Sequence, residues 1–223
     1  MEYHLLITGL GNPGEDYAGT RHNMGFAVAD ALIERAEARK SMRLTALTED
    51  GDYRLWEMLL GGKGVLLAKP MTYMNRSGKA VAQILGRHGL VPEKLLVVHD
   101  ELDLPLGRIK LKKGGGSAGN KGIESIDEHL STPGYWRMRL GIGKPATRRA
   151  AADWVLTPFT EAEREAADQV TAQAVTGLEA FLRRGQQAAQ QLLHPFLAPA
   201  AAVLDDGPDA AVADDETPSG VDS

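Results

Sequence analysis

The chain has 223 residues, no cysteine and a formal net charge of −5. This length fits one medium-sized domain that buries its own core, and the lack of cysteine excludes disulfides, a thiolate nucleophile and cysteine-type zinc sites. The first residues lack the basic region of a signal peptide, and the apolar run after them is too short to cross a bilayer, so we expect a cytoplasmic protein.

The charge is distributed unevenly along the chain. Residues 201–223 contain seven of the 30 acidic residues and no Lys or Arg, so residues 1–200 carry a net charge of +2. The acidic segment has too few bulky apolar residues to fold alone. We therefore expect one folded domain over residues 1–196 and an acidic, disordered tail over residues 197–223.

Apolar runs and amphipathic stretches alternate along the chain. We expect strands over residues 3–9, 42–48, 53–60, 64–69, 95–100, 106–112 and 136–143. The expected helices cover residues 23–38, 77–88 with Ser77 as N-cap, 120–130, 149–155 and 160–185. This order predicts an α/β fold in a single domain, with a mostly parallel, twisted mixed sheet and helices on both faces.

Sheets of this kind bind ligands beyond the carboxyl ends of their strands. Three such ends carry polar residues: the turn after Gly9, the turn in residues 70–78 and the acidic turn after Asp100. We expect these three turns to converge on one site.

Gly9, Gly11 and Gly14 have the spacing of a dinucleotide-binding fingerprint, which requires a helix to begin at the third glycine. Residues 15–20 lack a helical apolar stripe, so the pattern argues against a nicotinamide or flavin enzyme. The plainer interpretation is that these glycines permit a positive φ in a tight turn.

One histidine, one carboxylate and two amides in these turns form a plausible hydrolytic set. A carboxylate such as Asp100 fixes the tautomer of a histidine such as His22, whose other nitrogen then takes a proton from water. Amide groups such as those of Asn12 and Asn75 can hold a carbonyl oxygen as charge develops on it. Each residue alone also fits a structural role in a turn, a cap or a salt bridge.

Several long segments together carry a more specific signal: Gly9-Leu10-Gly11-Asn12-Pro13-Gly14, Thr20-Arg21-His22-Asn23, Pro70-Met71-Thr72-Tyr73-Met74-Asn75, His99-Asp100-Glu101-Leu102-Asp103-Leu104-Pro105, Lys110-Leu111-Lys112-Lys113-Gly114-Gly115-Gly116 and Arg137-Met138-Arg139-Leu140-Gly141-Ile142-Gly143. In this order and at this spacing they resemble the bacterial peptidyl-tRNA hydrolase family, over about residues 3–195.

The resemblance implies hydrolysis of the ester between a peptide and the 3′-terminal ribose of tRNA, which recycles tRNA from stalled translation. By similarity, His22 is the general base on water and Asp100 orients it. Asn12 and Asn75 hold the peptide and its scissile carbonyl. The further substrate contacts that it implies are Tyr17, Met74, Asn120 and Lys121, and the tRNA phosphate contacts are Lys110, Lys112 and Arg139.

We expect no cofactor, no metal, no membrane association and a monomer, with peptidyl-tRNA as the partner. The loop after Gly116 departs from the family's usual pattern, because Asn120 stands where a histidine is common and Lys121 where an asparagine is usual. Asparagine donates and accepts hydrogen bonds, whereas lysine only donates. The two residues either contact substrate in a changed way or represent a neutral change. They are also the features that favour a non-catalytic RNA-binding protein on the same fold.

Overall fold

The computed structural model describes residues 2–48, 51–145 and 150–201. Its centre is a seven-stranded sheet in the order β2-β3-β4-β1-β5-β7-β6. The strands are β1 (Leu5–Gly9), β2 (Thr45–Thr48), β3 (Tyr53–Leu60), β4 (Lys63–Pro70), β5 (Leu95–Glu101), β6 (Ile109–Lys113) and β7 (Trp136–Gly141). β4, β1, β5 and β7 pair in parallel, whereas β2, β3 and β6 pair antiparallel with their neighbours.

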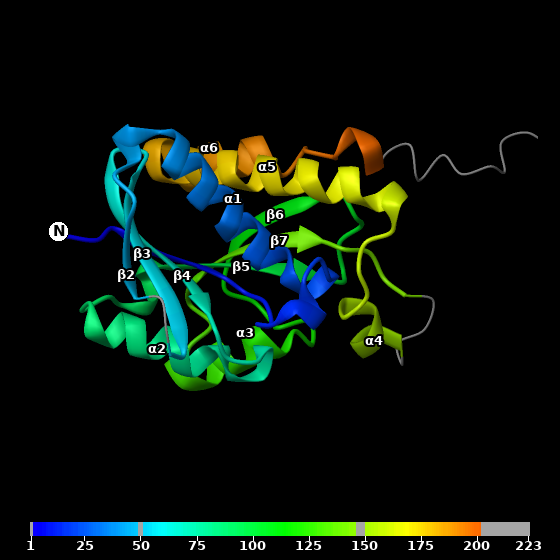
Figure 1. Ribbon diagram of the computed structural model, residues 1–223, viewed down its shortest axis with the longest axis horizontal. Coiled ribbons are helices and arrows are strands. Elements are labelled where there is room, and N and C mark those ends of the chain that lie inside the picture. The colour runs from blue at the N-terminus through cyan, green and yellow to red at the C-terminus, as the bar shows by residue number, and fades with distance from the viewer. Residues whose placement is uncertain (1, 49–50, 146–149, 202–223) are drawn as a thin grey trace, which may run out of the picture.

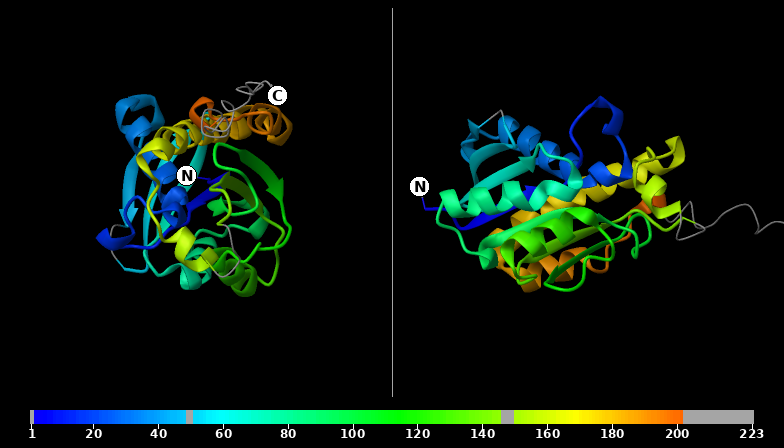
Figure 2. Two further views of the ribbon diagram at one scale, coloured as in Figure 1. Left: turned by 90° about the vertical axis from the view of Figure 1, so that its right-hand side faces the viewer. Right: turned by 90° about the horizontal axis from the view of Figure 1, so that it is seen from below.

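Helices cover both faces of this sheet. They are α1 (Met24–Ala38), α2 (Ser77–Arg87), α3 (Lys121–Leu130), α4 (Ala151–Val155), α5 (Glu161–Arg184) and α6 (Gln186–Leu193). Figure 1 shows α1, α5 and α6 on one side of the strands and α2 and α3 on the other, with α4 apart from both groups. The left view of Figure 2 agrees, with the yellow and orange helices of α5 and α6 above the strands and the green helices below them. The predicted α/β fold, with a sheet that is parallel in its core, is confirmed.

The two central strands explain why the sheet has two apolar faces. Every residue of β1 and of β5 is buried, as expected for parallel strands that are covered on both sides. Ile7 and Val98 pack in the core beneath α1 and α5, while Leu6 and Val97 pack in the core with α2 and α3. Alternate residues of one strand therefore hold both helical layers in place.

Gly9 and Gly11 are required by close packing rather than by backbone conformation. A methyl group on Gly9 would overlap the carbonyl oxygen of Gly25 in α1, and one on Gly11 would overlap the ring of Phe26. Of the three glycines in this turn only Gly14 has a positive φ, of +107°. The tight-turn interpretation is therefore correct for Gly14 and wrong for the other two. The helix that a dinucleotide site needs does not begin at Gly14, since α1 begins at residue 24.

The prediction that Ser77 caps α2 is wrong. Arg76 occupies the N-cap position, and Ser77 is the first helical residue. The Ser77 hydroxyl donates to the backbone oxygen of Met74 at 2.9 Å instead of accepting from the helix. A 3₁₀ turn over Met74–Arg76 leads directly into α2, so the helix begins without a side-chain cap.

The packed body of the protein continues past residue 196. Ala198 and Ala201 are buried, and the Ala198 backbone N–H donates to the Gly107 carbonyl at 3.0 Å. The predicted tail therefore begins with residues that pack against the domain. Residues 202–223 lie outside the described residues, so a separate acidic tail stays a prediction. Along the described ranges, no helix is both long enough and apolar enough to cross a membrane.

Substitutions at two glycines of α2 can test how tightly α2 packs against α3. A methyl group on Gly78 would overlap the Ser125 carbonyl in α3, whereas one on the exposed Gly86 would meet nothing within 4 Å. We expect Gly78→Ala to lower the free energy of unfolding by about 2–3 kcal/mol through overpacking. The matched Gly86→Ala should raise it by up to about 1 kcal/mol. Urea denaturation measures both, and equal effects would contradict this packing.

Candidate active site

A pocket of about 510 Å³ lies where the turns after β1, β4 and β5 meet. Its polar lining includes Asn12 from the turn after β1, Asn75 from the turn after β4 and Asp100 near the carboxyl end of β5. The predicted convergence of these three strand ends is confirmed. The facing wall is apolar and consists of α4 and the residue after it, with Ala151, Ala152, Val155 and Leu156.

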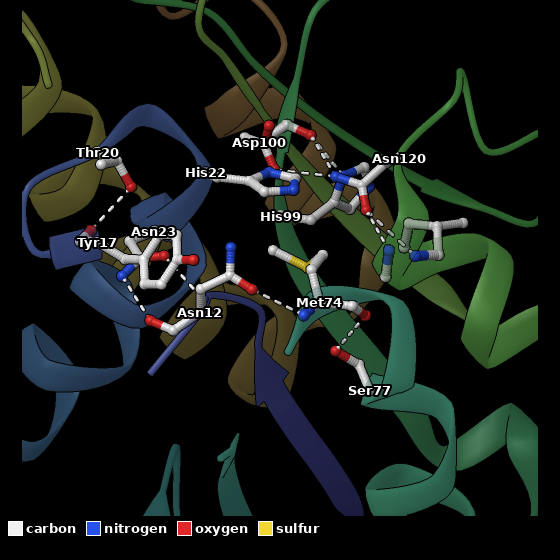
Figure 3. A network of polar contacts seen from close by, with 12 residues as sticks. Asn12, Tyr17, Thr20, His22, Asn23, Met74, Ser77, His99, Asp100 and Asn120 are labelled. Atoms are coloured by element: carbon white, nitrogen blue, oxygen red, sulfur yellow. Dashed lines mark hydrogen bonds and ion pairs between the residues drawn. The ribbon is translucent and has the colours of Figure 1, made fainter. Parts of the chain in front are cut away.

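His22 and Asp100 form a buried pair in this pocket (Figure 3). His22 lies in a 3₁₀ turn, Arg21–Asn23, just before α1, and its Nδ1 is 2.9 Å from Oδ1 of Asp100. The His22 residue is 7% exposed and Asp100 is 3% exposed. An ionised carboxylate only accepts hydrogen bonds, so Nδ1 carries the proton and Nε2 holds a free lone pair. Among the described residues, none forms a hydrogen bond with Nε2.

Asn12 is held so that its amide nitrogen faces the centre of the pocket. Its side-chain oxygen accepts from the Met74 backbone N–H at 2.7 Å, which fixes the orientation of the amide. Its own backbone exchanges two hydrogen bonds with the side chain of Asn23, at 2.8 and 3.0 Å. Figure 3 shows the Asn12 amide nitrogen pointing toward the space beside the His22 ring. A donor is therefore preset next to the candidate base.

Asp100 is held by two further residues. The amide nitrogen of Asn120 donates to Asp100 Oδ1 at 2.9 Å, and Nδ1 of His99 donates to the Asp100 backbone oxygen at 2.7 Å. Burial lowers the pKa of the fully buried His99 below its ordinary value, so this imidazole is neutral near neutral pH. Both the carboxylate and the peptide group of Asp100 therefore have fixed positions.

Arg21 anchors the turn that carries His22, and sequence reasoning did not assign it a role. Its side chain is 2% exposed, donates to Glu163 at 2.8 Å and stacks over Trp154, with the guanidinium carbon 3.9 Å from the ring centre. The Arg21 backbone N–H also donates to Thr157 at 3.1 Å. The histidine turn is thus attached to both α5 and the segment after α4.

The other predicted substrate residues lie in or beside the pocket. Met74 is buried and Asn75 is exposed, and both line the pocket from the 3₁₀ turn before α2. Lys121 lines it too, is mostly exposed and pairs with Glu124 at 2.9 Å. Tyr17 does not line the pocket but packs edge-to-face on Tyr73, which does, with ring centres 6.3 Å apart.

Asn120 also lines the pocket, but its amide already has partners in the protein. Its oxygen accepts from the backbone N–H groups of Gly122 and Ile123, so it caps α3, while its nitrogen contacts Asp100. The structure thus shows these contacts within the protein, and the substrate contact of Asn120 stays a prediction.

The predicted tRNA-binding residues share one face of the β6–β7 pair. Lys110 lies directly opposite Arg139 in the antiparallel register, and Lys112 lies two residues further along. Arg139 is paired with the pocket residue Glu101 at 2.7 Å, and Lys110 donates to the His194 backbone oxygen at 3.2 Å. The basic strands therefore adjoin the pocket through Glu101.

Sequence reasoning missed three features of the site. Arg21 and Asn23 flank His22 in a segment that the sequence analysis names. No sequence pattern, however, shows that the Arg21 side chain binds Glu163 or that the Asn23 side chain binds the Asn12 backbone. The wall formed by α4 was not assigned to the site, although Trp154-Val155-Leu156 continues the family resemblance, because alanine and valine occur in any short helix. Among the described residues, no group of three or more His, Asp or Glu side chains is placed to bind a metal ion.

Comparison with known proteins gives consistent results. The family model described as "Peptidyl-tRNA hydrolase" matches residues 6–200. The chain is 49% identical to the peptidyl-tRNA hydrolase of Maridesulfovibrio salexigens, covering 88% of this chain and 96% of that one. It is 46% identical to that of Nocardia farcinica, covering 85% and 95%. The crystal structure of peptidyl-tRNA hydrolase from Acinetobacter baumannii superimposes with a TM-score of 0.79 at 34% identity, covering 89% and 98%.

The Arg21–Glu163 pair gives a prediction for stability. Burial raises the pKa of the Glu163 carboxyl, but hydrogen bonds from Arg21 and Thr160 outweigh this, so the pKa lies below its ordinary value of 4.5. The carboxylate therefore stabilises the fold fully above about pH 4.5, and this contribution is lost as the pH falls through the lower, folded-state pKa.

We expect Glu163→Gln to lower the free energy of unfolding at pH 7 by about 1 kcal/mol, because a charge-assisted bond that is partly open to solvent becomes a neutral one. The difference from wild type should shrink as the pH falls below 4.5. Melting curves between pH 3 and 7 measure it, with Glu161→Gln, exposed on the same helix, as control. A difference that grows at low pH would contradict the assignment.

Proposed function

Because the chain belongs to the peptidyl-tRNA hydrolase family, whose function is the hydrolysis of peptidyl-tRNA, we propose that His22 is the general base of this reaction. The observation that carries the proposal is the 2.9 Å hydrogen bond from Nδ1 to Asp100, which leaves Nε2 free in the pocket. Asp100 orients the ring and stabilises the imidazolium that forms.

The proposed reaction is direct attack by water. Nε2 of His22 takes a proton from a water molecule as its oxygen bonds to the carbonyl carbon of the ester. The tetrahedral intermediate then collapses and breaks the bond to the 3′ oxygen of the terminal ribose. That oxygen takes the proton back from Nε2, which gives tRNA, the peptide's carboxylic acid and the regenerated base, and the acid then loses its proton to solvent.

Two asparagines supply the polar contacts to the reacting carbonyl. Asn12 already points its amide nitrogen into the pocket, so we assign it as the donor that stabilises the developing oxyanion. Asn75, exposed in the pocket lining next to Met74, is assigned to hold the peptide backbone and the attacking water. Met74 and the tyrosine pair Tyr17–Tyr73 border the path of the peptide.

The tRNA is proposed to lie along the β6–β7 face and the start of α3. Lys110, Lys112 and Arg139 share this face, next to the pocket. Lys121 is exposed at the pocket edge, within reach of a phosphate near the ester. Such contacts fix the register of the acceptor end without reading its sequence.

We also propose that the protein acts as a monomer in the cytoplasm, where peptidyl-tRNA is made. The residues of one chain bring His22, Asp100, Asn12 and Asn75 together in one pocket, which supports a complete site in each molecule. Sedimentation at the concentration of the activity assay tests this assignment, and a dimer that loses activity on dissociation would contradict it.

The base assignment predicts a loss of rate rather than of binding. We expect His22→Ala to lower kcat by about 10³-fold and Asp100→Asn by about 10²-fold, with little change in tRNA affinity. Hydrolysis of a labelled N-acetylated aminoacyl-tRNA measures the rate. His4→Ala is the control, because His4 is exposed at the opposite end of β1. If tRNA binds but wild-type protein does not hydrolyse it, the chain is an RNA-binding protein instead.

The tRNA assignment predicts a change in salt dependence. Loss of one phosphate contact should weaken binding and reduce the slope of log K against log salt concentration by about 1. We expect this for Lys112→Gln and not for Lys40→Gln, an equal charge change on an exposed residue beyond the far end of α1. Filter binding of deacylated tRNA at several salt concentrations distinguishes the two variants. Equal slopes for both variants would remove Lys112 from the interface.

A further inference from the structure

We propose that Asn120 is a positioning residue, which fixes the Asp100 carboxylate and through it the base His22, and that it is not a substrate contact. The inference rests on the proposed roles of His22 and Asp100. It concerns the residue at the start of α3, where this chain differs from the pattern that the sequence analysis describes.

The first step is the orientation of the Asn120 amide. Its oxygen accepts from the backbone N–H groups of Gly122 at 3.0 Å and Ile123 at 3.2 Å, the first donors of α3. These helix-capping bonds require the oxygen to face the helix, so the nitrogen must face the other way. On that side it meets Asp100 Oδ1 at 2.9 Å (Figure 3). A flipped amide would lose both sets of bonds.

The second step is the restraint on Asp100. One carboxylate oxygen, Oδ1, accepts from both His22 Nδ1 and Asn120 Nδ2, each at 2.9 Å. These donors come from different elements of the fold, the 3₁₀ turn before α1 and the start of α3, and Asp100 is 3% exposed. Rotation of the carboxylate would break both bonds in a place where water does not readily replace them.

The third step is that the hydrogen bonds of the Asn120 amide are made within the protein. Its oxygen accepts two hydrogen bonds, and its nitrogen contacts the Asp100 carboxylate at 2.9 Å and the Asp100 backbone oxygen at 3.4 Å. A side-chain amide offers two acceptor sites and two donor hydrogens, and here both acceptor sites and the shorter donor contact are used within the protein. Because an amide does not titrate, this support for Asp100 is independent of pH.

Asn120→Asp separates positioning from capping. Aspartate caps a helix as well as asparagine does, so a residue that only caps α3 should tolerate the change at any pH. Next to Asp100, however, the new carboxyl can donate a hydrogen bond only when protonated, and it repels Asp100 when ionised. We expect kcat relative to wild type to be about tenfold lower at pH 8 and to recover toward wild type near pH 5.

Asn120→Ser is the matched control. Serine also caps helices, but its side chain is shorter and has one oxygen, which cannot reach Asp100 while it accepts the capping hydrogen bonds. We expect kcat to fall about tenfold at every pH, with KM and the melting temperature nearly unchanged. The assay is hydrolysis of an N-acetylated aminoacyl-tRNA, with wild type and His22→Ala measured alongside.

Three results would overturn the inference. They are a ratio of Asn120→Asp to wild type that does not vary with pH, full activity of Asn120→Ser, and a raised KM with unchanged kcat in Asn120→Ser, which indicates substrate contact. The proposed function fails separately, if wild type shows no turnover or if His22→Ala is as active as wild type.

Discussion

The hydrogen bond between His22 and Asp100 depends on the parallel pairing of β1 with β5. The two residues are 78 positions apart, and they meet because both segments leave neighbouring strands at the same edge of the sheet. Gly9 allows α1 to approach β1 at backbone distance, which places the turn before α1 over that edge. Burial then keeps water from competing for the bond, so the pair combines a fixed geometry with a strong interaction.

Asparagine side chains make most of the other positioning contacts. Asn23 binds the backbone of Asn12, Asn12 binds the Met74 peptide, and Asn120 links α3 to Asp100. Each amide uses its oxygen and nitrogen in different directions, so one residue can connect two segments. Charged pairs such as Arg139–Glu101 lie at the border of the pocket. Within the pocket, the Asp100 carboxylate is therefore held by the His22 ring and by an amide side chain.

The sequence predicted the strands, most helices and the meeting of three strand ends, because buried parallel strands and amphipathic helices have distinct apolar periods. It did not predict α6, since the pattern over residues 160–185 continues and only Gly185, with a φ of +84°, separates the two helices. The contact between Asn120 and Asp100 was not predicted either. Asn120 lies 20 residues after Asp100, with β6 between them, and shows no local sign of the contact, which arises only from tertiary packing.

The pairing of β1 with both β4 and β5 also has a consequence for biosynthesis. His22 leaves the ribosome long before Asp100, and Glu163, which holds the neighbouring Arg21, follows later still. Contacts between segments so distant in the chain form slowly and late in folding. A nascent or truncated chain that ends before β5 contains the histidine without its carboxylate. The His22–Asp100 pair therefore forms as one of the last events in the folding of each new molecule, after the central strands have paired.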